Sequence, residues 1–186
     1  MSTHAAGVFD AKMSPEHIRP ASSPSDFAAF ASLVTEYVAW FRTRYHDDAD
    51  FVDGIFGHQS LDAELQALPR AYAAPNGRAL LAVREDGQVA GAGAYRRLPD
   101  GACEMKRLFV PARFGGHGTG RRLCNTLIAS ARDDGYALMR LDTGRRLLEA
   151  ISMYESLGFT RCPPYHEYPA ALMREIVFME LSLSKP

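Results

Sequence analysis

The amino-acid sequence predicts a single mixed α/β domain whose central sheet is mostly antiparallel, contains one parallel pair of strands and is flanked by helices. Its 186 residues suit one domain with a sizeable core. Three apolar segments, residues 80–83, 89–95 and 102–110, are separated by glycine-containing turns, which predicts an antiparallel meander. A helical segment then separates the third strand from a strand at residues 138–141, and two strands joined through a helix pair in parallel.

The first forty-five or so residues predict an extension, an edge strand and a helix. Residues 1–15 show little periodicity, so we expect a loose N-terminal extension before one domain over residues 16–186. Residues 17–20 suit a short edge strand that ends at a proline. Apolar residues then recur at three- and four-residue steps as far as Tyr45, which predicts an amphipathic helix, and Ser25 is its expected N-cap.

An acidic segment follows that helix. Residues 46–53 contain four aspartates and predict a solvated loop, although a functional role for the charges stays open. A second, shorter helix is predicted over residues 60–68, and prolines with an Asn-Gly turn separate it from the meander.

The glycine-rich segment after the third meander strand predicts an anion site. Gly115, Gly116, Gly118 and Gly120 follow an apolar run and precede a helical pattern. Glycine lets the backbone approach a phosphate, the first N–H groups of a helix lack internal partners, and the helix dipole favours negative charge. The alternative is a flexible surface connection. In either case, the segment lacks the Lys-Ser or Lys-Thr pair of an ATP-binding loop.

A dinucleotide-binding loop is the other nucleotide alternative. Asp142 stands at roughly the distance at which such loops place an acidic residue. About a hundred residues precede the loop without an earlier copy of the strand–helix unit. The segment therefore predicts a phosphate-bearing ligand and does not favour ATP or NAD.

Two strands and one helix complete the predicted fold. Gly135 suits the end of the helix after the glycine-rich segment. A helix over residues 147–157 ends at Gly158, Phe159 begins a strand, and a final strand spans residues 176–183.

Composition limits the classes of partner. A net charge of −1 argues against nonspecific nucleic-acid binding, and no apolar run approaches the roughly 18 residues of a membrane span. We expect a cytoplasmic protein, because no secretory signal is visible and the three cysteines suit reduced thiols. We also expect no metal, because the cysteines and histidines lack the spacing of ligands.

Two motifs resemble the GCN5-related N-acetyltransferase (GNAT) superfamily. Its glycine motif is Gln/Arg-x-x-Gly-x-Gly/Ala, and the run Gly115-Gly116-His117-Gly118-Thr119-Gly120 matches both downstream positions while Gly115 replaces the first. A second family feature, an Ala, a Tyr and then Gly-Phe, resembles Ala150, Tyr154 and Gly158-Phe159. Leu147 replaces an Asn that is frequent in the family. The resemblance covers nearly the whole chain and implies that the parallel pair of strands splays apart.

The resemblance implies acetyl-CoA as co-substrate. Its pyrophosphate would lie on backbone N–H groups of the glycine-rich segment, and its pantetheine arm would lie along the strand before it. The implied coenzyme-binding residues are Leu108, Phe109, Val110, Gly115, Gly116, Gly118, Thr119, Gly120 and Arg121. The implied activity is direct transfer of the acetyl group to a primary amine of a small molecule or peptide.

The resemblance also implies two catalytic side chains. Tyr154 aligns with the general acid and Glu104 with the general base, although a base acting through water stays open. The alternatives are a core tyrosine and an outward-facing strand residue. For the whole chain, the alternative is a non-catalytic acyl-CoA-binding module on the same fold. A homodimer is expected from relatives, and Asp47, Asp48, Asp50 and Asp53 are expected to attract cationic amines.

Overall fold

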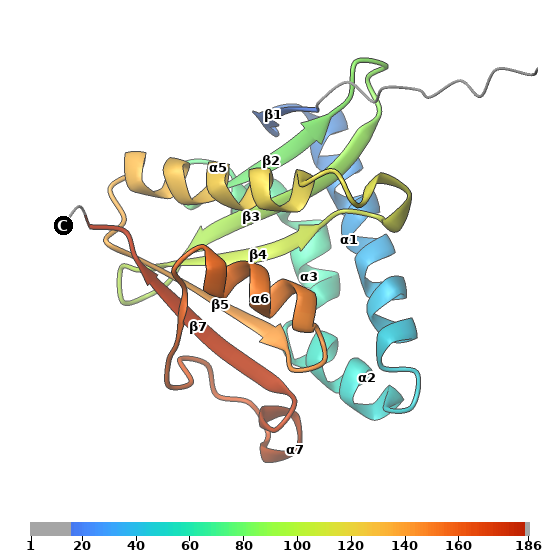
Figure 1. Cartoon of the computed structure of the whole chain (residues 1–186), viewed down its shortest axis with the longest axis vertical. Helices are drawn as coiled ribbons and strands as arrows, with labels where there is room; N and C mark the ends of the chain where they lie inside the picture. The colour runs from blue at the N-terminus through green and yellow to red at the C-terminus, as the bar shows by residue number, and fades with distance from the viewer. Residues whose placement is uncertain (1–15, 185–186) are drawn as a thin grey trace, which may run out of the picture.

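The computed structural model describes residues 16–184, and within this range the strands form one sheet in the order β1-β2-β3-β4-β5-β7-β6 (Figure 1). The extension predicted for residues 1–15 lies outside the described residues. The strands are β1 (His17–Pro20), β2 (Gly77–Val83), β3 (Val89–Arg97), β4 (Cys103–Phe109), β5 (Leu138–Gly144), β6 (Thr160–Arg161) and β7 (Ile176–Ser182).

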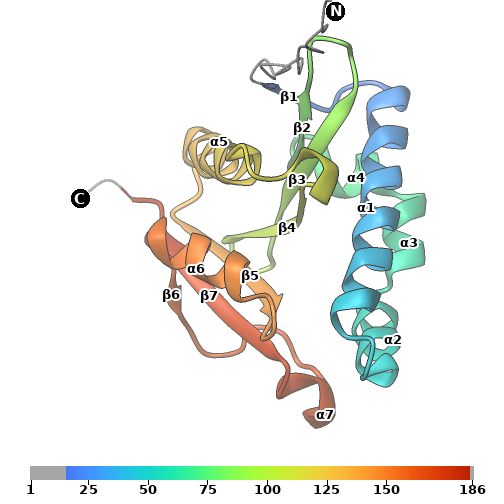
Figure 2. The same cartoon turned by 45° about the vertical axis from the view of Figure 1, so that its right-hand side comes forward.

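Helices cover both faces of the sheet. Figure 2 shows α1 to α4 on one face and α5 with α6 on the other. None of the described helices is both long enough and apolar enough to cross a membrane. The helices are α1 (Pro24–Arg44), α2 (Ala49–His58), α3 (Leu61–Gln66), α4 (Leu68–Tyr72), the 3₁₀ turn η1 (Ala112–Phe114), α5 (Thr119–Asp133), α6 (Leu148–Ser156) and α7 (Ala170–Met173).

The N-cap of helix α1 lies two residues earlier than predicted. The N-cap is Ser23, not Ser25, because the Ser23 hydroxyl accepts the N–H of Asp26 at 3.1 Å. The Asp26 carboxylate in turn accepts the N–H of Ser23 at 3.0 Å, which completes a capping box. Pro24 occupies the first helical position, where a missing N–H costs nothing.

The acidic segment is not a loop, because most of it belongs to α2. Asp48 caps that helix by accepting the N–H of Phe51 at 3.1 Å. Apolar side chains of α2, among them Phe51 and Phe56, are buried against α1 and β7. The spacing of these apolar residues is helical, but the four aspartates of residues 46–53 led to the prediction of a solvated loop. The helix predicted over residues 60–68 is also divided, into α3 and α4.

The parallel pair β4–β5 confirms the predicted fold class. Only Cys103↔Met139 and Glu104↔Arg140 are paired between these strands, whereas β5 pairs with β7 along its whole length. Beyond Glu104 the two strands diverge. The divergence leaves one edge of β4 without a strand partner, and such an edge needs another source of hydrogen bonds.

A bulge in β4 marks the start of the divergence. The register of β3 with β4 shifts between Ala92 and Ala94, and Arg107 has a φ of 57°, which is rare outside glycine. Buried contacts hold this backbone. The Arg107 guanidinium donates to both carboxylate oxygens of Glu64 at 2.9 and 2.7 Å, and the Tyr72 hydroxyl donates to Glu64 at 2.7 Å. These hydrogen bonds connect α3 and α4 to the bulge in β4.

Candidate active site

A cavity of about 360 Å³ lies where β4 and β5 diverge. Its walls come from residues 105–110 of β4 and the turn after it, from residues 141–144 of β5, from α1 and α2 on one face, and from α6 with the first turn of α5 on the other. Aromatic side chains dominate the wall made by α1 and α2: Tyr37, Trp40, Phe41, Phe51 and Phe56. Of the predicted coenzyme residues, Leu108, Phe109, Val110 and Gly120 line the cavity.

The glycine-rich segment presents free N–H groups at the start of α5. Gly116 has a φ of 82° and Gly118, the N-cap, a φ of 73°, values that glycine adopts without strain. No described residue accepts the backbone N–H of residues 116–121. The N–H of Gly115 differs, because it donates to the carbonyl of Ala112 at 3.0 Å. The backbone N–H of Gly115 is thus engaged within the chain, and its predicted contact with the phosphates stays a prediction.

The side chains around these N–H groups are held by ion pairs and hydrogen bonds. Glu16, on the edge of the described chain, accepts the buried Thr119 hydroxyl at 3.0 Å and pairs with Arg122. The Arg121 guanidinium donates to the Ser156 hydroxyl at 2.8 Å and joins α5 to α6. Thr119 therefore stabilises the segment through its side chain, while its N–H stays free.

Tyr154 lies on α6, is buried in the core and is one of the residues that line the cavity. The ring packs edge-on against Phe159 at 5.6 Å between centroids and lines the cavity wall. No described residue forms a hydrogen bond with its hydroxyl. Burial raises the pKa of Tyr154 far above its usual value, with a smaller contribution from Cys124, so the hydroxyl keeps its proton at neutral pH.

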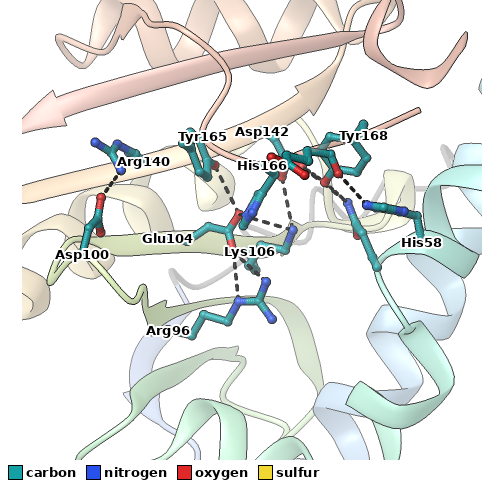
Figure 3. Close-up of polar contacts among 12 residues, drawn as sticks. His58, Arg96, Asp100, Glu104, Lys106, Arg140, Asp142, Tyr165, His166 and Tyr168 are labelled. Atoms are coloured by element: carbon teal, nitrogen blue, oxygen red, sulfur yellow. Dashed lines mark hydrogen bonds and ion pairs between the residues drawn. The ribbon is translucent and has the colours of Figure 1, made fainter. Parts of the chain in front are cut away.

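Glu104 lies outside the cavity wall and is fully buried among cations (Figure 3). The Nε2 of His166 lies 2.7 Å from one carboxylate oxygen, to which the Tyr165 hydroxyl also donates at 3.2 Å. Lys106 Nζ lies 3.6 Å from this same oxygen, and Arg96 Nε donates to the other oxygen at 2.9 Å. The carboxylate is fully engaged.

These contacts disfavour the predicted role of Glu104 as a base. Burial by itself would raise the pKa of the carboxyl. The charge of Lys106, the hydrogen bond from His166 and the charge of Arg96 outweigh it and hold the pKa well below the usual range. A carboxylate with so low a proton affinity takes protons poorly. The catalytic role of Glu104 stays a prediction that its contacts do not favour.

Two carboxylates line the cavity: that of Glu149 on α6, which is exposed and pairs with Arg44, and that of Asp142 on β5. Asp142 belongs to the same polar cluster as Glu104. Its side chain is 7% exposed, and one oxygen lies 3.2 Å from Lys106 Nζ. The other oxygen accepts the Tyr168 hydroxyl at 2.6 Å (Figure 3). The same oxygen also accepts the Gln59 amide at 3.4 Å. Sequence reasoning noticed Asp142 only in testing the nucleotide alternative. It missed Lys106, which lies two residues after Glu104 and therefore on the same face of β4.

The predicted capturing aspartates do not line the cavity. Asp47 pairs with Arg146, and Asp53 pairs with Arg42 at 2.7 Å. Asp48 caps α2. Three of the four charges are therefore engaged in stabilising the helical layer.

Comparison with known proteins identifies the family of this chain. The model of the acetyltransferase (GNAT) family matches residues 31–159. A protein of Schizosaccharomyces pombe named an uncharacterized N-acetyltransferase is 35% identical over 163 residues, which cover 87% of this chain and 91% of that protein.

Solved structures share the fold. A protein of Klebsiella pneumoniae assigned as an acyl-CoA N-acyltransferase superposes with a TM-score of 0.63 at 26% identity, covering 91% of this chain and 98% of that one. An acetyltransferase structure from Salmonella typhimurium, containing acetyl-CoA, has a TM-score of 0.58 at 22% identity and covers 93% of this chain and 96% of that one. The match of the family model over more than half of the chain, together with the S. pombe relative, shows that this chain belongs to the GNAT family of N-acetyltransferases.

Proposed function

We propose that the chain transfers an acetyl group from acetyl-CoA directly to a primary amine. The observation that carries the proposal is a cavity at the divergence of β4 and β5 whose wall includes both the first turn of α5 and Tyr154. Bound acetyl-CoA in the related Salmonella structure supports the choice of co-substrate.

The N-terminus of α5 suits the phosphates of the coenzyme. The free N–H groups of residues 116–121 and the helix dipole favour an anion there. The pantetheine arm, which carries amide groups, suits the edge of β4 from Leu108 to Val110, because that edge faces no strand.

The reaction balances without a further reagent. The lone pair of a neutral amine attacks the thioester carbonyl, a C–N bond forms, and the carbonyl oxygen gains negative charge that backbone N–H groups near Val110 stabilise. The C–S bond then breaks. The nitrogen loses one proton and the sulfur gains one, which yields an amide and the free thiol of coenzyme A.

Tyr154 is the side chain proposed to assist the departing sulfur. A thiol has a pKa of about 8.5, which lies below that of this buried hydroxyl, so the hydroxyl stabilises the developing thiolate by donating a hydrogen bond. The proton that the nitrogen loses then neutralises the sulfur. Because both oxygens of Glu104 already accept hydrogen bonds within the protein, we propose that water in the cavity carries that proton.

Release of coenzyme A in the presence of a panel of primary amines tests the proposal. We expect turnover with at least one amine and a mass increase of one acetyl group on that amine. Tight binding of acetyl-CoA in calorimetry without turnover above hydrolysis would instead establish the non-catalytic acyl-CoA-binding alternative.

A further inference from the structure

The wall of the cavity opposite α6 has the composition of a site for an apolar molecule. Tyr37 lies at its centre, with its ring 6.1 Å from that of Trp40, 6.1 Å from that of Phe56 and 5.6 Å from that of Phe109. Such a wall favours an apolar body, above all a ring that packs edge-on or stacked against these side chains.

The charged groups along this wall are already matched. Lys106 pairs with Asp142, and Arg107 pairs with Glu64 through two hydrogen bonds. Lys106 and Asp142 have side chains less than a tenth exposed. An acceptor that carried a second charge would have to bury it here without a counter-ion, which is costly.

Two acceptors at the cavity are open to the nitrogen of the acceptor amine: the Asp142 carboxylate and the Gln59 Oε1, which is buried and has no hydrogen-bond partner among the described residues. Asp142 accepts three hydrogen bonds, from Lys106, Tyr168 and Gln59, and a carboxylate has about four acceptor positions. The Asp142 side chain is 7% exposed, and the residue lines the cavity. The Gln59 amide is oriented by the same contacts, because its NH₂ group donates both to Asp142 and, at 3.2 Å, to the Tyr168 hydroxyl.

We propose that the acceptor is a primary amine with an apolar, otherwise uncharged body, which lies against Tyr37, Trp40 and Phe56 while its nitrogen donates a hydrogen bond to Asp142. Gln59 and Tyr168 are positioning residues for this carboxylate. The proposal rests on the proposed acetyl transfer, names its substrate class, and replaces the cationic acceptor that the acidic segment predicted.

Charge on the acceptor is the variable to test. With saturating acetyl-CoA, kcat/KM is measured for 2-phenylethylamine, for phenylalanine, which adds a carboxylate, and for 1,4-diaminobutane, in which a chain ending in a second cation replaces the apolar ring. We expect 2-phenylethylamine to exceed each of the others at least ten-fold. Higher kcat/KM for either charged amine overturns this proposal and leaves acetyl transfer intact, whereas absence of turnover with every primary amine overturns both.

Binding can be followed without turnover. Trp40 is the single tryptophan of the chain and lines the cavity, so its fluorescence reports what lies against it. Titration of the complex with coenzyme A should give a saturable change with 2-phenylethylamine and none with 1,4-diaminobutane over the same range. The reverse result contradicts the proposal.

The Asp142→Asn variant tests the carboxylate. We expect a loss of at least ten-fold in kcat/KM for 2-phenylethylamine with the dissociation constant of acetyl-CoA unchanged within two-fold, because the substitution lies away from the first turn of α5. Asp133→Asn, at the exposed end of α5, is the matched control. Unchanged kcat/KM in a variant that still binds acetyl-CoA overturns the assignment of Asp142. If Asp142→Asn does not fold, the kcat/KM values of the three amines with the unmodified chain still test the proposed acceptor class.

Discussion

Two carboxylates of one polar cluster, Glu104 and Asp142, face different surroundings although both contact Lys106. Glu104 lies on β4 at the last position paired with β5 and is fully buried, and cations and hydrogen-bond donors engage both of its oxygens. Asp142 lies on β5 at the cavity, two residues beyond the last position paired with β4. The divergence of the strands therefore determines which carboxylate a substrate meets.

Removal of one hydroxyl tests the role of Tyr154. Tyr154→Phe keeps the ring and its packing, so we expect turnover to fall on the order of 10²-fold while acetyl-CoA affinity stays nearly constant. Turnover is measured where chemistry limits the rate, and affinity by calorimetry. Unchanged turnover under these conditions would return Tyr154 to the role of a core tyrosine.

The lowered pKa of Glu104 predicts a pH-dependent contribution to stability. The contribution is fully present above the unfolded-state pKa, near 4.5, and is lost as the pH falls from there toward the folded-state pKa. At pH 7, Glu104→Gln should lower the free energy of unfolding by about 3 kcal/mol, because it leaves Arg96 and Lys106 with an uncharged neighbour.

Urea unfolding at pH 7 and at pH 4 measures this difference. The gap between the parent and the variant should narrow at the lower pH. Glu85→Gln, in the exposed turn between β2 and β3, serves as control and should be neutral. A gap that widens on acidification would mean that the Glu104 carboxylate is not stabilised by its cationic neighbours.

At the scale of elements, the start of α5 combines two glycines with different physical requirements. Gly118 needs its positive φ, so any other residue there strains the backbone as well as crowding a phosphate. Gly120 lies in the first helical turn, and an added Cβ would meet only a Val110 methyl at the ordinary distance of 3.8 Å. A substitution at Gly120 therefore distinguishes an effect on acetyl-CoA binding from an effect on stability better than one at Gly118 does.

Gly120→Val should weaken acetyl-CoA binding by at least about ten-fold without lowering Tm, since valine has a higher helix propensity than glycine. The side chain would project where the coenzyme phosphates approach. Gly57→Val in α2 is the matched control, because that glycine is exposed and has no atom within 4 Å of an added Cβ. Equal affinities in the two folded variants would place the phosphates elsewhere.

At the scale of the whole molecule, the sheet consists of two parts joined at two residue pairs. Strands β1 to β4 form one part and β5 to β7 the other. They are paired at Cys103↔Met139 and Glu104↔Arg140, and further along β4 and β5 the cavity separates them. Helices α1 and α2 cover the opening on one face and α6 on the other (Figure 1). A ligand in the cavity contacts both parts and should couple them.

Acetyl-CoA at 100 times its dissociation constant should raise the free energy of unfolding by about 2.7 kcal/mol. Hydrogen exchange should slow most at residues 116–121, whose N–H groups have no acceptor among the described residues and face the coenzyme in the proposed complex. It should also slow at those N–H groups of residues 107–110 that point away from β3. The β2–β3 hairpin, which lies away from the cavity, should change little. Protection confined to that hairpin would contradict the assigned site.

The sequence by itself determined the fold class and the segments that build the cavity. Strand periodicity predicted the meander, and the glycine-rich segment with the Tyr154 motif predicted a GNAT fold, because these signals are local and each is carried by a few neighbouring residues. The local signal failed at α2, where aspartates that cap and flank a helix resembled a solvated loop.

Only the tertiary structure decided which polar side chains meet. Gln59 and Asp142 are 83 positions apart, and His166 reaches Glu104 from 62 positions away. Periodicity reports which face of an element is buried, but it carries no information on which distant donor or cation a buried carboxylate will contact. Those contacts depend on the register of β4 against β5 and on where these strands diverge. The lowered pKa of Glu104 and the position of Asp142 at the cavity therefore follow from the assembled sheet and not from the local sequence.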